Sequence, residues 1–422
     1  MGYQSLGDVR QHDSHHSLVG MPEHASGAGM PPVPLDAIIV PGSRKVPNFE
    51  HAIGLAHAIG CKLVAICSHD VTAWHMQRMA ASLSFENLIA IDLPDGYSHP
   101  LLDFETAGWL NRELPDACTH KSNLSAKRNI GLLLGTMLGW TRVFYLDDDI
   151  RNIEASGLRK TIAMLDDGYT VAGLRVTKFP DNSVVCHAHR ATGGQLQGVF
   201  VSGSALAVDI EGAPGFFPEI YNEDWLSFYP AAVSGKLGLS DCHATQLLYD
   251  PFDTPHRAAW QEFGDMLAEG IYGLLHDRRD LSYATSDYWQ MFLRARRHFL
   301  EDILVRTEDP RITVRPGLVE CVETARKILT QVTPELCVHY VRLWQHDQVT
   351  WTQRLASIKG TATTIDQATR ELRLPASGPT WETTLPMPDQ RYGPAEVTAA
   401  APQRPASLLQ VALSLLQTTL RI

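Results

Sequence analysis

Short apolar runs alternate with helix-like stretches along the first half of the chain. An apolar run that ends at turn residues predicts a buried strand, and apolar residues spaced by three and four predict a helix. The strands are predicted at Ala37–Val40, Lys62–Cys67, Leu88–Leu93, Arg142–Leu146 and Tyr169–Val176. The helices are predicted at Phe49–Ile59 (capped by Asn48, ended by Gly60), Val71–Leu83, Leu124–Leu138 (ended by Gly139) and Leu158–Leu165. This alternation indicates an α/β fold whose mostly parallel sheet has helices on both faces.

The second half of the chain has a different pattern. Residues 183–250 mix short strand-like runs with glycine-rich turns. Farther on, helices are predicted at Trp260–Leu275, Tyr288–Val305, Leu318–Gln331 and Leu336–Ile358. The second of these helices has an apolar face formed by Phe292, Ala295, Phe299 and Ile303. We therefore expect a helical C-terminal subdomain at residues 258–373, packed on an α/β domain at residues 35–257.

The two ends of the chain lack such patterns. Residues 1–34 are rich in Gly, Pro, His and Ser and are expected to form a flexible leader, with His12, His15 and His16 belonging to a polar tail and not to a metal site. Residues 374–422 begin as a proline-rich tail and end in an apolar helix candidate, Ser407–Leu420. That segment lacks the basic face of a membrane-surface helix, so we expect it to dock on the body or to form a homo-oligomer.

Composition and charge narrow the class of protein. The chain has 422 residues, 44% hydrophobic and 20% charged, as expected for a soluble globular protein with more than one domain. Its net charge of −11 argues against nucleic acid as a partner. We expect neither a membrane span nor a secretory signal, because no apolar run approaches about 18 residues and the N-terminus has no apolar core segment. Seven scattered cysteines without a CxxC pair favour reduced thiols and a cytoplasmic location.

Three consecutive aspartates follow the strand predicted at Arg142–Leu146. Ligands of parallel α/β sheets bind beyond the carboxyl ends of the strands, and Asp147, Asp148 and Asp149 lie at such an end. Side chains of an extended strand alternate between faces, so Asp147 and Asp149 are expected to point the same way. Two carboxylates on one side suit Mg²⁺ or Mn²⁺, which also take phosphate oxygens as ligands. The alternative interpretation is a solvated acidic turn.

Other polar residues could complete such a site. Glu223 and Asp224, just before Trp225, could supply a general base, or they could be acids that stabilise a helix N-terminus. Lys127 and Arg128, in the helix before the aspartates, could face a diphosphate, or they could be solvated basic residues.

Two weaker candidates come from loops. His256 could add a third metal ligand, although a lone loop histidine is more often a surface residue. The glycine-rich stretch at 193–204 could let the backbone approach a sugar closely. It fits neither the GxxxxGK[ST] nor the GxGxxG phosphate-binding pattern.

The order of these motifs resembles that of the GT-A glycosyltransferases, most nearly those of family 2. That family has a first strand ending in a proline-containing loop, an Ala-Arg-Asn-x-Gly helix, a strand ending in a DxD-type motif, and a glycine-rich segment before a Glu-Asp pair and Trp. The corresponding segments here are Ile39–Ser43, Ala126–Gly131 (with Lys127 as an extra residue), Leu146–Asp149 and Gly203–Trp225. The resemblance covers roughly residues 36–260 and implies a GT-A type, Rossmann-like catalytic domain.

The resemblance also implies an activity and roles for residues. It implies a metal-dependent transfer of a sugar from a nucleotide-diphosphate sugar to an acceptor hydroxyl, with inversion. Asp224 would be the catalytic base beside Glu223, Asp149 would ligate the metal, and Asp147 would contact the metal shell or the donor ribose. The donor-binding residues would be Pro41, Ser43, Arg44, Ser68, Asp70, Lys127, Arg128, Asp147 and Asp148. The family usually has an acidic pair after the second strand, where this chain has Ser68-His69-Asp70, so the nucleobase stays open.

Three alternatives remain at this point. A retaining GT-A transferase could use the same motifs. A sugar-phosphate nucleotidyltransferase would need a glycine-rich nucleotide loop after the first strand, and Pro41–Lys45 is a poor version of one. A non-catalytic nucleotide-sugar binding module would not need intact acids at both Asp147–Asp149 and Glu223–Asp224. The acidic chain favours a small or soluble acceptor over a lipid-linked one.

Overall fold

The computed structural model describes residues 15–21, 34–118, 122–178, 181–198 and 200–377. These residues lie in one unit, Met1–Pro379. The expected terminal helix at Ser407–Leu420 and the residue His12 lie outside the described residues.

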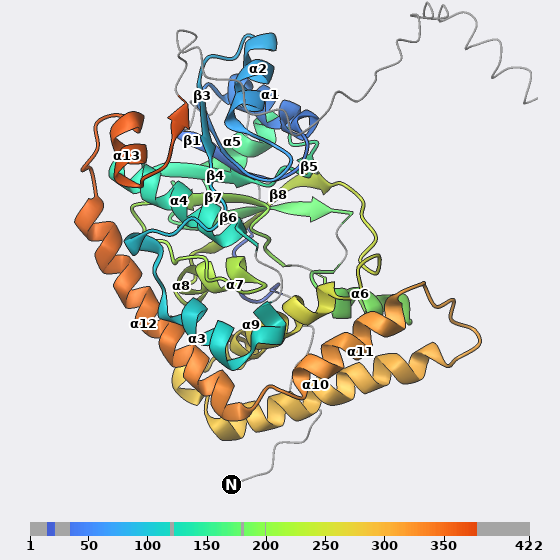
Figure 1. The fold of residues 1–422 in the computed structure, drawn as a ribbon. Coiled ribbons are helices and arrows are strands. Elements are labelled where there is room, and N and C mark those ends of the chain that lie inside the picture. The colour runs from blue at the N-terminus through green and yellow to red at the C-terminus, as the bar shows by residue number, and fades with distance from the viewer. Residues whose placement is uncertain (1–14, 22–33, 119–121, 179–180, 199, 378–422) are drawn as a thin grey trace, which may run out of the picture. The chain divides into compact units, whose positions relative to one another are not determined.

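A mixed sheet forms the centre of the described chain (Figure 1). Its nine described strands have the order β5-β8-β6-β7-β4-β1-β2-β3-β9. Strands β3, β2, β1 and β4 are parallel, whereas β7 runs antiparallel to both of its neighbours, β4 and β6. The strands are β1 (Ala37–Gly42), β2 (Lys62–Cys67), β3 (Leu88–Asp92), β4 (Arg142–Leu146), β5 (Ile150–Arg151), β6 (Val171–Thr177), β7 (Ala205–Asp209), β8 (Leu237–Gln246) and β9 (Ala376–Ser377).

Helices cover both faces of this sheet, as the alternation of strands and helices predicts. Strand β1 shows why: its residues are all buried, and successive side chains enter different cores. Ile38 and Val40 belong to a cluster with residues of α1, α2 and α5, while Ile39 belongs to a cluster with residues of α4. The helices of this part are α1 (Glu50–Ile59), α2 (Ala73–Ser82), α3 (Glu105–Glu113), α4 (Leu124–Met137), α5 (Ala155–Ala163), α6 (Val184–Ala191), α7 (Glu223–Ser227) and α8 (Tyr229–Val233).

Helix α4 lies close against the sheet because Gly131 has no side chain. A Cβ atom at that position would lie 2.9 Å from Ile39 Cδ1 and 3.0 Å from the Tyr145 hydroxyl. The Tyr145 hydroxyl, fully buried, donates to the backbone carbonyl of Arg128 at 2.7 Å. These contacts fix the first turns of α4 over β1 and β4.

Most predicted elements of the first half are confirmed. The strands β2 and β4 have the predicted bounds. Gly60 and Gly139 follow α1 and α4 with left-handed φ values of 82° and 67°. The predicted cap at Asn48 is wrong, because Asn48 lies inside a 3₁₀ turn, Val46–Phe49, in which Pro47 is the second residue. Helix α1 therefore begins after Phe49, without a side-chain cap.

The segment at 183–250 is more helical than its pattern indicates. Its start, Val184–Ala191, is helix α6 and not a strand or turn. Its β-branched start favours a strand locally, but the helix is capped by the Ser183 hydroxyl, which accepts from the Cys186 N–H, and its first five residues are buried. Helices α7 and α8 follow before β8, and α3 also escaped prediction.

The four helices predicted in the helical part are present, three with slightly wider bounds and α11 two residues shorter, and α13 was not predicted. Phe292, Ala295 and Ile303 of the predicted apolar face are buried, and Phe299 is partly buried against the same core. Helix α12 packs on α10, α3 and α4. These helices are α9 (Arg257–His276), α10 (Ser286–Thr307), α11 (Leu318–Leu329), α12 (Pro334–Ile358) and α13 (Ile365–Glu371).

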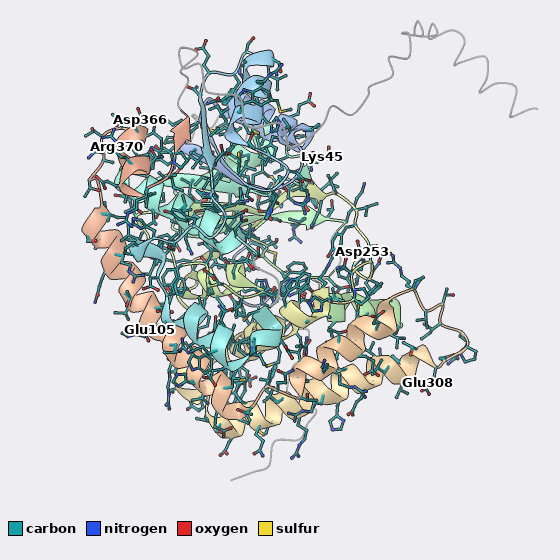
Figure 2. All side chains as sticks on the ribbon, in the orientation of Figure 1. Lys45, Glu105, Asp253, Glu308, Asp366 and Arg370 are labelled. Atoms are coloured by element: carbon teal, nitrogen blue, oxygen red, sulfur yellow. The ribbon has the colours of Figure 1, made fainter. Side chains whose placement is uncertain are left out.

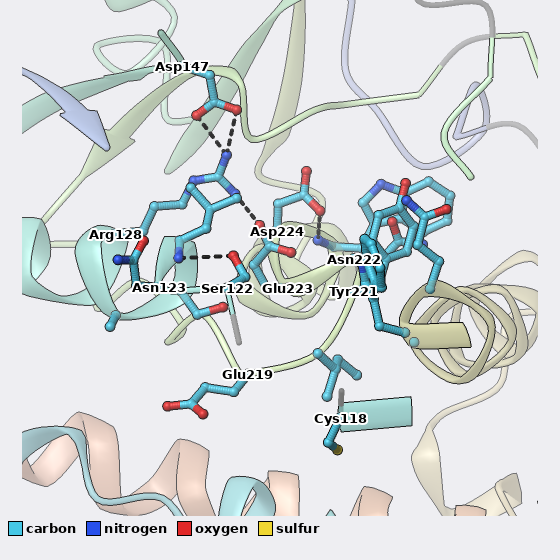
Figure 3. Close-up of a pocket in the computed structure, with 18 of the residues that line it drawn as sticks. Cys118, Ser122, Asn123, Arg128, Asp147, Glu219, Tyr221, Asn222, Glu223 and Asp224 are labelled. Carbon is cyan, nitrogen blue, oxygen red and sulfur yellow. Dashed lines mark hydrogen bonds and ion pairs between the residues drawn. The ribbon is translucent and has the colours of Figure 1, made fainter. Parts of the chain in front are cut away.

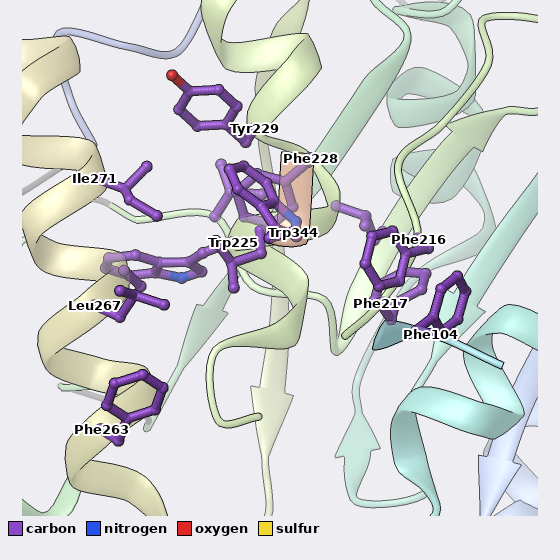
Figure 4. Close-up of a cluster of buried hydrophobic side chains, with 14 of the residues drawn as sticks. Phe104, Phe216, Phe217, Trp225, Phe228, Tyr229, Phe263, Leu267, Ile271 and Trp344 are labelled. Atoms are coloured by element: carbon purple, nitrogen blue, oxygen red, sulfur yellow. The ribbon is translucent and has the colours of Figure 1, made fainter. Parts of the chain in front are cut away.

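An aromatic core joins these helices to the sheet (Figure 4). Trp225 of α7 lies against Tyr272 of α9, with ring centroids 5.3 Å apart, and Tyr229 of α8 meets Trp344 of α12 at 5.3 Å. Charged side chains such as Lys45 and Glu308 are exposed at the periphery (Figure 2). The short helix α7 is therefore fixed by a large apolar core directly behind it.

Part of the expected leader belongs to this core. His15 is fully buried, its ring lies 4.0 Å from that of Trp225, and its Nδ1 accepts from the Val201 N–H at 3.2 Å. Burial lowers the pKa of His15 to about 3, so its ring is neutral. Gly20 continues the contact by forming a parallel bridge with Gly238 of β8. Residues 15–21 are thus part of the fold, and the expectation of a flexible leader does not apply to them.

All seven cysteines are free thiols, as the sequence analysis predicts. Among the described helices, none is long and apolar enough to cross a bilayer.

Candidate active site

A cavity of about 980 Å³ lies beyond the carboxyl ends of the parallel strands (Figure 3). The residues that follow β1, β2, β3 and β4 all contribute to its wall, among them Arg44, His69, Asp95 and Asp147. The sheet order changes direction between β1 and β4, and such a switch point is where α/β sheets bind ligands. A second cavity of about 570 Å³ shares Arg44 with the first and includes Asp149.

Arg128 connects the two acidic motifs predicted from the sequence, Asp147–Asp149 and Glu223–Asp224. It lies on the second turn of α4 and is only 2% exposed. Its Nη2 donates to Asp147 at 3.0 and 3.1 Å, and its Nη1 donates to Glu223 at 2.5 Å. The guanidinium stays charged: burial alone would lower its pKa, but the surrounding carboxylates hold the pKa above its usual value. Arg128 is therefore an ion-paired bridge across the site and not a solvated residue.

Asp148 holds the loop after β1. Its Oδ2 accepts from the backbone N–H groups of Ser43 and Arg44, both at 2.8 Å, and Arg44 also donates to its Oδ1. The Asp148 side chain is almost fully buried, whereas half of the Arg44 side chain is exposed. Asp148 thus places Arg44 at the cavity, and Pro41, inside β1, contributes to the buried strand that leads there.

The predicted alternation of the three aspartates is not observed. The chain turns directly after β4, since the Ile150 N–H donates to the Asp147 carbonyl at 3.1 Å. Asp149 turns towards Arg44 Nη2 at 3.1 Å and accepts from Gln246 Nε2 at 3.2 Å, while Asp147 faces Arg128. Burial, with its neighbouring aspartates, raises the pKa of Asp149 to about 6, even though Arg44 opposes this shift.

His256 does not join these aspartates. Among the described residues, only Cys186, Asp265 and Glu269 form a group of three potential metal ligands within 4.8 Å of one another. His256 lies at the start of α9 and lines neither of the two cavities, and its ring lies 6.0 Å from that of Trp260. The assignment of Asp147 and Asp149 as metal ligands stays a prediction.

The acidic pair of α7 lines the cavity on the other side of Arg128 from Asp147. Both carboxyl groups line it together with Asp147. Asp224 Oδ2 accepts from the Gly203 N–H at 2.6 Å, and its Oδ1 accepts from the Trp225 N–H at 2.9 Å. Burial raises the pKa of Glu223 to about 7 and also raises that of Asp224, against the opposing effect of Arg128. Glu223 can therefore hold or release a proton near neutral pH.

The loop that carries this pair is fixed on helix α4. Asn129 Nδ2 donates to the Phe217 carbonyl and its Oδ1 accepts from the Phe217 N–H, both at 2.8 Å. Ser125 Oγ donates to the Pro218 carbonyl at 2.8 Å. Asn129 thus holds the backbone of Phe217 in place. Helix α4 therefore positions both Arg128 and the segment that leads to Glu223.

Lys127 is buried between the ends of β1 and β2. It is 1% exposed, and its Nζ donates to the Gly42 carbonyl at 2.5 Å and to Ser68 Oγ at 2.7 Å. Burial lowers its pKa to about 8. It joins the ends of β1 and β2 and lines neither of the two cavities. The Asp70 side chain also stays outside both cavities, while its neighbour His69 enters the larger one.

Several lining residues were missed by sequence reasoning. Asp95 and Tyr97 follow β3, and their position just after a predicted strand was a usable signal. Asn123, Glu219 and Trp260 come from loop and helix ends and had no local signal. Their place at the cavity depends on contacts between distant parts of the chain.

Comparisons with known proteins show weak similarity to a few solved structures. No family model and no curated protein matches the chain. Among solved structures it is similar to M. tuberculosis glucosyl-3-phosphoglycerate synthase, with 10% identity and a TM-score of 0.34 over 56% of this chain and 80% of that one. It is also similar to S. aureus TarS, in complex with UDP-GlcNAc (13% identity, TM-score 0.33) and alone (12%, 0.33), over 70% of this chain and 90% of TarS in both cases. The function proposed below rests on the site geometry.

Proposed function

We propose that this protein is a metal-dependent glycosyltransferase that moves a sugar from a nucleotide-diphosphate sugar to an acceptor hydroxyl with inversion. The observation that carries this proposal is the bridge from Asp147 through Arg128 to Glu223 inside one cavity at the switch point of the sheet. We propose that Asp147 belongs to the part of the cavity that binds the donor's diphosphate, and that the Glu223–Asp224 pair belongs to the part that accepts the proton. A single-displacement transfer needs these two parts on either side of the anomeric carbon.

The donor is expected to lie along the ends of β1 to β4. The loop of Ser43 and Arg44 leaves β1 at this edge, and His69 and Asp95 line the cavity after β2 and β3. Arg44 is half exposed at the cavity, and a guanidinium can bind a diphosphate through paired hydrogen bonds. The nucleobase would then contact residues such as His69 and Asp95, and not Asp70.

We propose that a divalent cation binds at the carboxylates of this edge. Five carboxyl groups and only two guanidinium groups line the main cavity, the acids being Asp95, Asp147, Glu219, Glu223 and Asp224. Asp149 lines the adjoining cavity, and burial raises its pKa. Asp147 and Asp149 would hold Mg²⁺ or Mn²⁺, whose oxygen preference they match. When bound, the ion would neutralise charge on the departing diphosphate.

Asp224 is the proposed base. The Gly203 and Trp225 N–H groups orient its carboxylate, and its raised pKa makes it a better proton acceptor than an exposed aspartate. It would take the acceptor proton as the acceptor oxygen bonds to the anomeric carbon and the bond to the diphosphate breaks. Glu223, bound to Arg128, would keep the helix start and Arg128 in place.

The test is transfer by Asp224→Asn compared with Glu223→Gln. Asp224→Asn is expected to lose at least about 100-fold in turnover with little change in donor affinity, because it removes the proton acceptor and one of the two oxygens that accept from the Gly203 and Trp225 N–H groups. Turnover near that of the unmodified protein would refute the base assignment. Proton NMR of the product's anomeric centre decides between inversion and retention.

A further inference from the structure

The residue before the acidic pair of α7 adopts a backbone conformation that few residues accept. Asn222 immediately precedes Glu223 and Asp224 on the wall of the main cavity, where Figure 3 labels all three. Its φ is 60° and its ψ is 35°, in the left-handed region that asparagine enters more easily than most other residues with a side chain. These two angles set the direction in which the next residues leave, so a rotation at Asn222 would reorient Asp224.

The Asn222 side chain is held from outside the cavity. It is 5% exposed, and its Nδ2 donates to Asp265 Oδ1 at 3.2 Å. Asn222 is the N-cap residue of α7, yet its side chain makes no capping hydrogen bond to that helix. Asp265 belongs to α9, is fully buried and lines neither of the two cavities. Asp265 therefore reaches the cavity wall through Asn222.

The two oxygens of the Asp265 carboxylate have different partners. Its Oδ2 accepts from Ser183 Oγ at 2.8 Å and from Arg296 Nη2 at 2.6 Å, whereas its Oδ1 faces Asn222. Arg296 is itself fixed, since its Nε and Nη2 donate to the two oxygens of Glu262, both at 2.9 Å. Burial alone would lower the pKa of Arg296, but the Glu262 and Asp265 carboxylates hold it well above its usual value. One oxygen is thus anchored by a permanent charge, and the other holds Asn222 in one orientation.

Helix α9 also contacts the chain on both sides of the acidic pair. Before the pair, a Cβ at Gly264 would lie 2.2 Å from the Tyr221 carbonyl oxygen, so α9 packs directly on this backbone. After the pair, the Tyr272 hydroxyl donates to the Trp225 carbonyl at 2.7 Å. The hydrogen bond to Asp265 adds a directional contact at the residue that adjoins the pair.

We propose that Asp265 is a positioning residue of this transferase: it holds the Asn222 side chain and thereby keeps Asp224 in the orientation that accepts the proton. The proposal rests on the proposed function, because it concerns the base of that same site. Loss of this hydrogen bond should lower kcat and leave donor affinity unchanged, because the proposed donor site lies at the ends of β1 to β4. A contact that only stabilises the fold would lower the Tm and leave the kcat of the folded protein unchanged.

The test exchanges the two side chains. Asp265→Asn places one amide against another, and Asn222→Asp places two carboxylates against each other, so each single variant breaks the hydrogen bond. The double variant Asn222→Asp/Asp265→Asn restores it in reverse, because the new amide at position 265 can donate to the new carboxylate at position 222. The oxygen of that amide can still accept from Ser183 and Arg296. Each single variant is expected to lose at least about tenfold in kcat, and the double variant to exceed the weaker single variant by at least about fivefold.

A glycine at the same position tests the hydrogen bond even where the exchanged proteins fold poorly. Asn222→Gly keeps the left-handed backbone accessible and removes the amide, so it should also lose at least about tenfold in kcat. The matched control is Asn152→Gly, at an exposed residue whose φ of 59° is also left-handed and which lines neither of the two cavities. This control should leave kcat unchanged.

Donor affinity by calorimetry and Tm by thermal denaturation accompany every kcat measurement, which is made on folded protein. Unchanged kcat in Asn222→Gly, or a double variant no more active than the weaker single variant, would overturn the role of Asp265. A loss of donor affinity equal to the loss of kcat would also overturn it. Absence of donor binding or of sugar transfer in the unmodified protein would overturn the proposed function instead.

Discussion

The substitution Gly203→Ala tests whether the position of Asp224 matters for turnover. Gly203 does not have a positive φ, so alanine fits the local backbone. Its added Cβ, however, would lie 2.7 Å from Asp224 Cβ and 2.9 Å from Arg128 Nη1. Relief of the first contact to an acceptable 3.4 Å requires a displacement of about 0.7 Å. Asp224 would move, and its hydrogen bond from the Gly203 N–H would be distorted.

The expected result is a large loss of turnover with a modest loss of stability. A misplacement of about 1 Å in a catalytic group can cost about 100-fold in rate, whereas overpacking typically costs about 1–3 kcal/mol of unfolding free energy. Initial rates would measure the first quantity and urea denaturation the second. Donor affinity, measured by calorimetry, should change by less than about threefold.

The matched control is Gly212→Ala. Its Cβ would lie 2.9 Å from Thr170 Cγ2, a similar overlap at a residue that does not line the cavity. This variant should keep its turnover once it is folded. A folded Gly203→Ala protein that turns over within about threefold of the unmodified rate would refute the role of Asp224. Equal losses in both variants would assign the effect to overpacking alone.

Three further predictions concern the buried charges. Arg128→Met should lower the unfolding free energy by about 3–5 kcal/mol, because the substitution leaves the Asp147 and Glu223 carboxylates unpaired. Mn²⁺ should then raise the Tm of this variant more than that of the unmodified protein. An equal or smaller rise in Tm would contradict this. The pKa of Glu223 is raised from 4.5 to about 7, so its folded form keeps a proton that the unfolded chain has lost, and stability should fall with rising pH across this window in EDTA. Urea denaturation at pH 5 and 7.5 should show a smaller fall in Glu223→Gln, and an equal fall would refute the assignment. Arg296→Met removes the only described cation that pairs with the fully buried Glu262 and Asp265, and should cost about 3–5 kcal/mol in urea denaturation, whereas a cost below about 1 kcal/mol would contradict the pairing.

Local sequence patterns were enough to predict where Asp147–Asp149 lie relative to the sheet. The strand β4 was predicted within its observed bounds because five consecutive apolar or bulky residues end at charged ones. The parallel arrangement then placed Asp147 at the ligand-binding edge of the sheet. The orientation of Asp148 was not predictable, because the chain turns immediately after β4 and the side chains no longer alternate.

The bridge through Arg128 was beyond sequence reasoning. Its two carboxylate partners, Asp147 and Glu223, lie 19 and 95 residues away along the chain, and no periodic pattern relates such positions. His15 was missed for a similar reason, since a histidine in a polar, glycine-rich stretch carries no local sign of burial. Its place against Trp225 depends on an aromatic core assembled from α7 and α9.

The central claim is that this cavity binds a nucleotide-diphosphate sugar together with a divalent metal. The most direct measurement is calorimetric titration of the purified protein with UDP-, GDP-, ADP- and TDP-sugars, first with Mn²⁺ and then with EDTA. The account predicts that one donor binds only in the presence of the metal, and that Asp149→Ala abolishes this binding. Failure of every donor to bind, with and without metal, would contradict it.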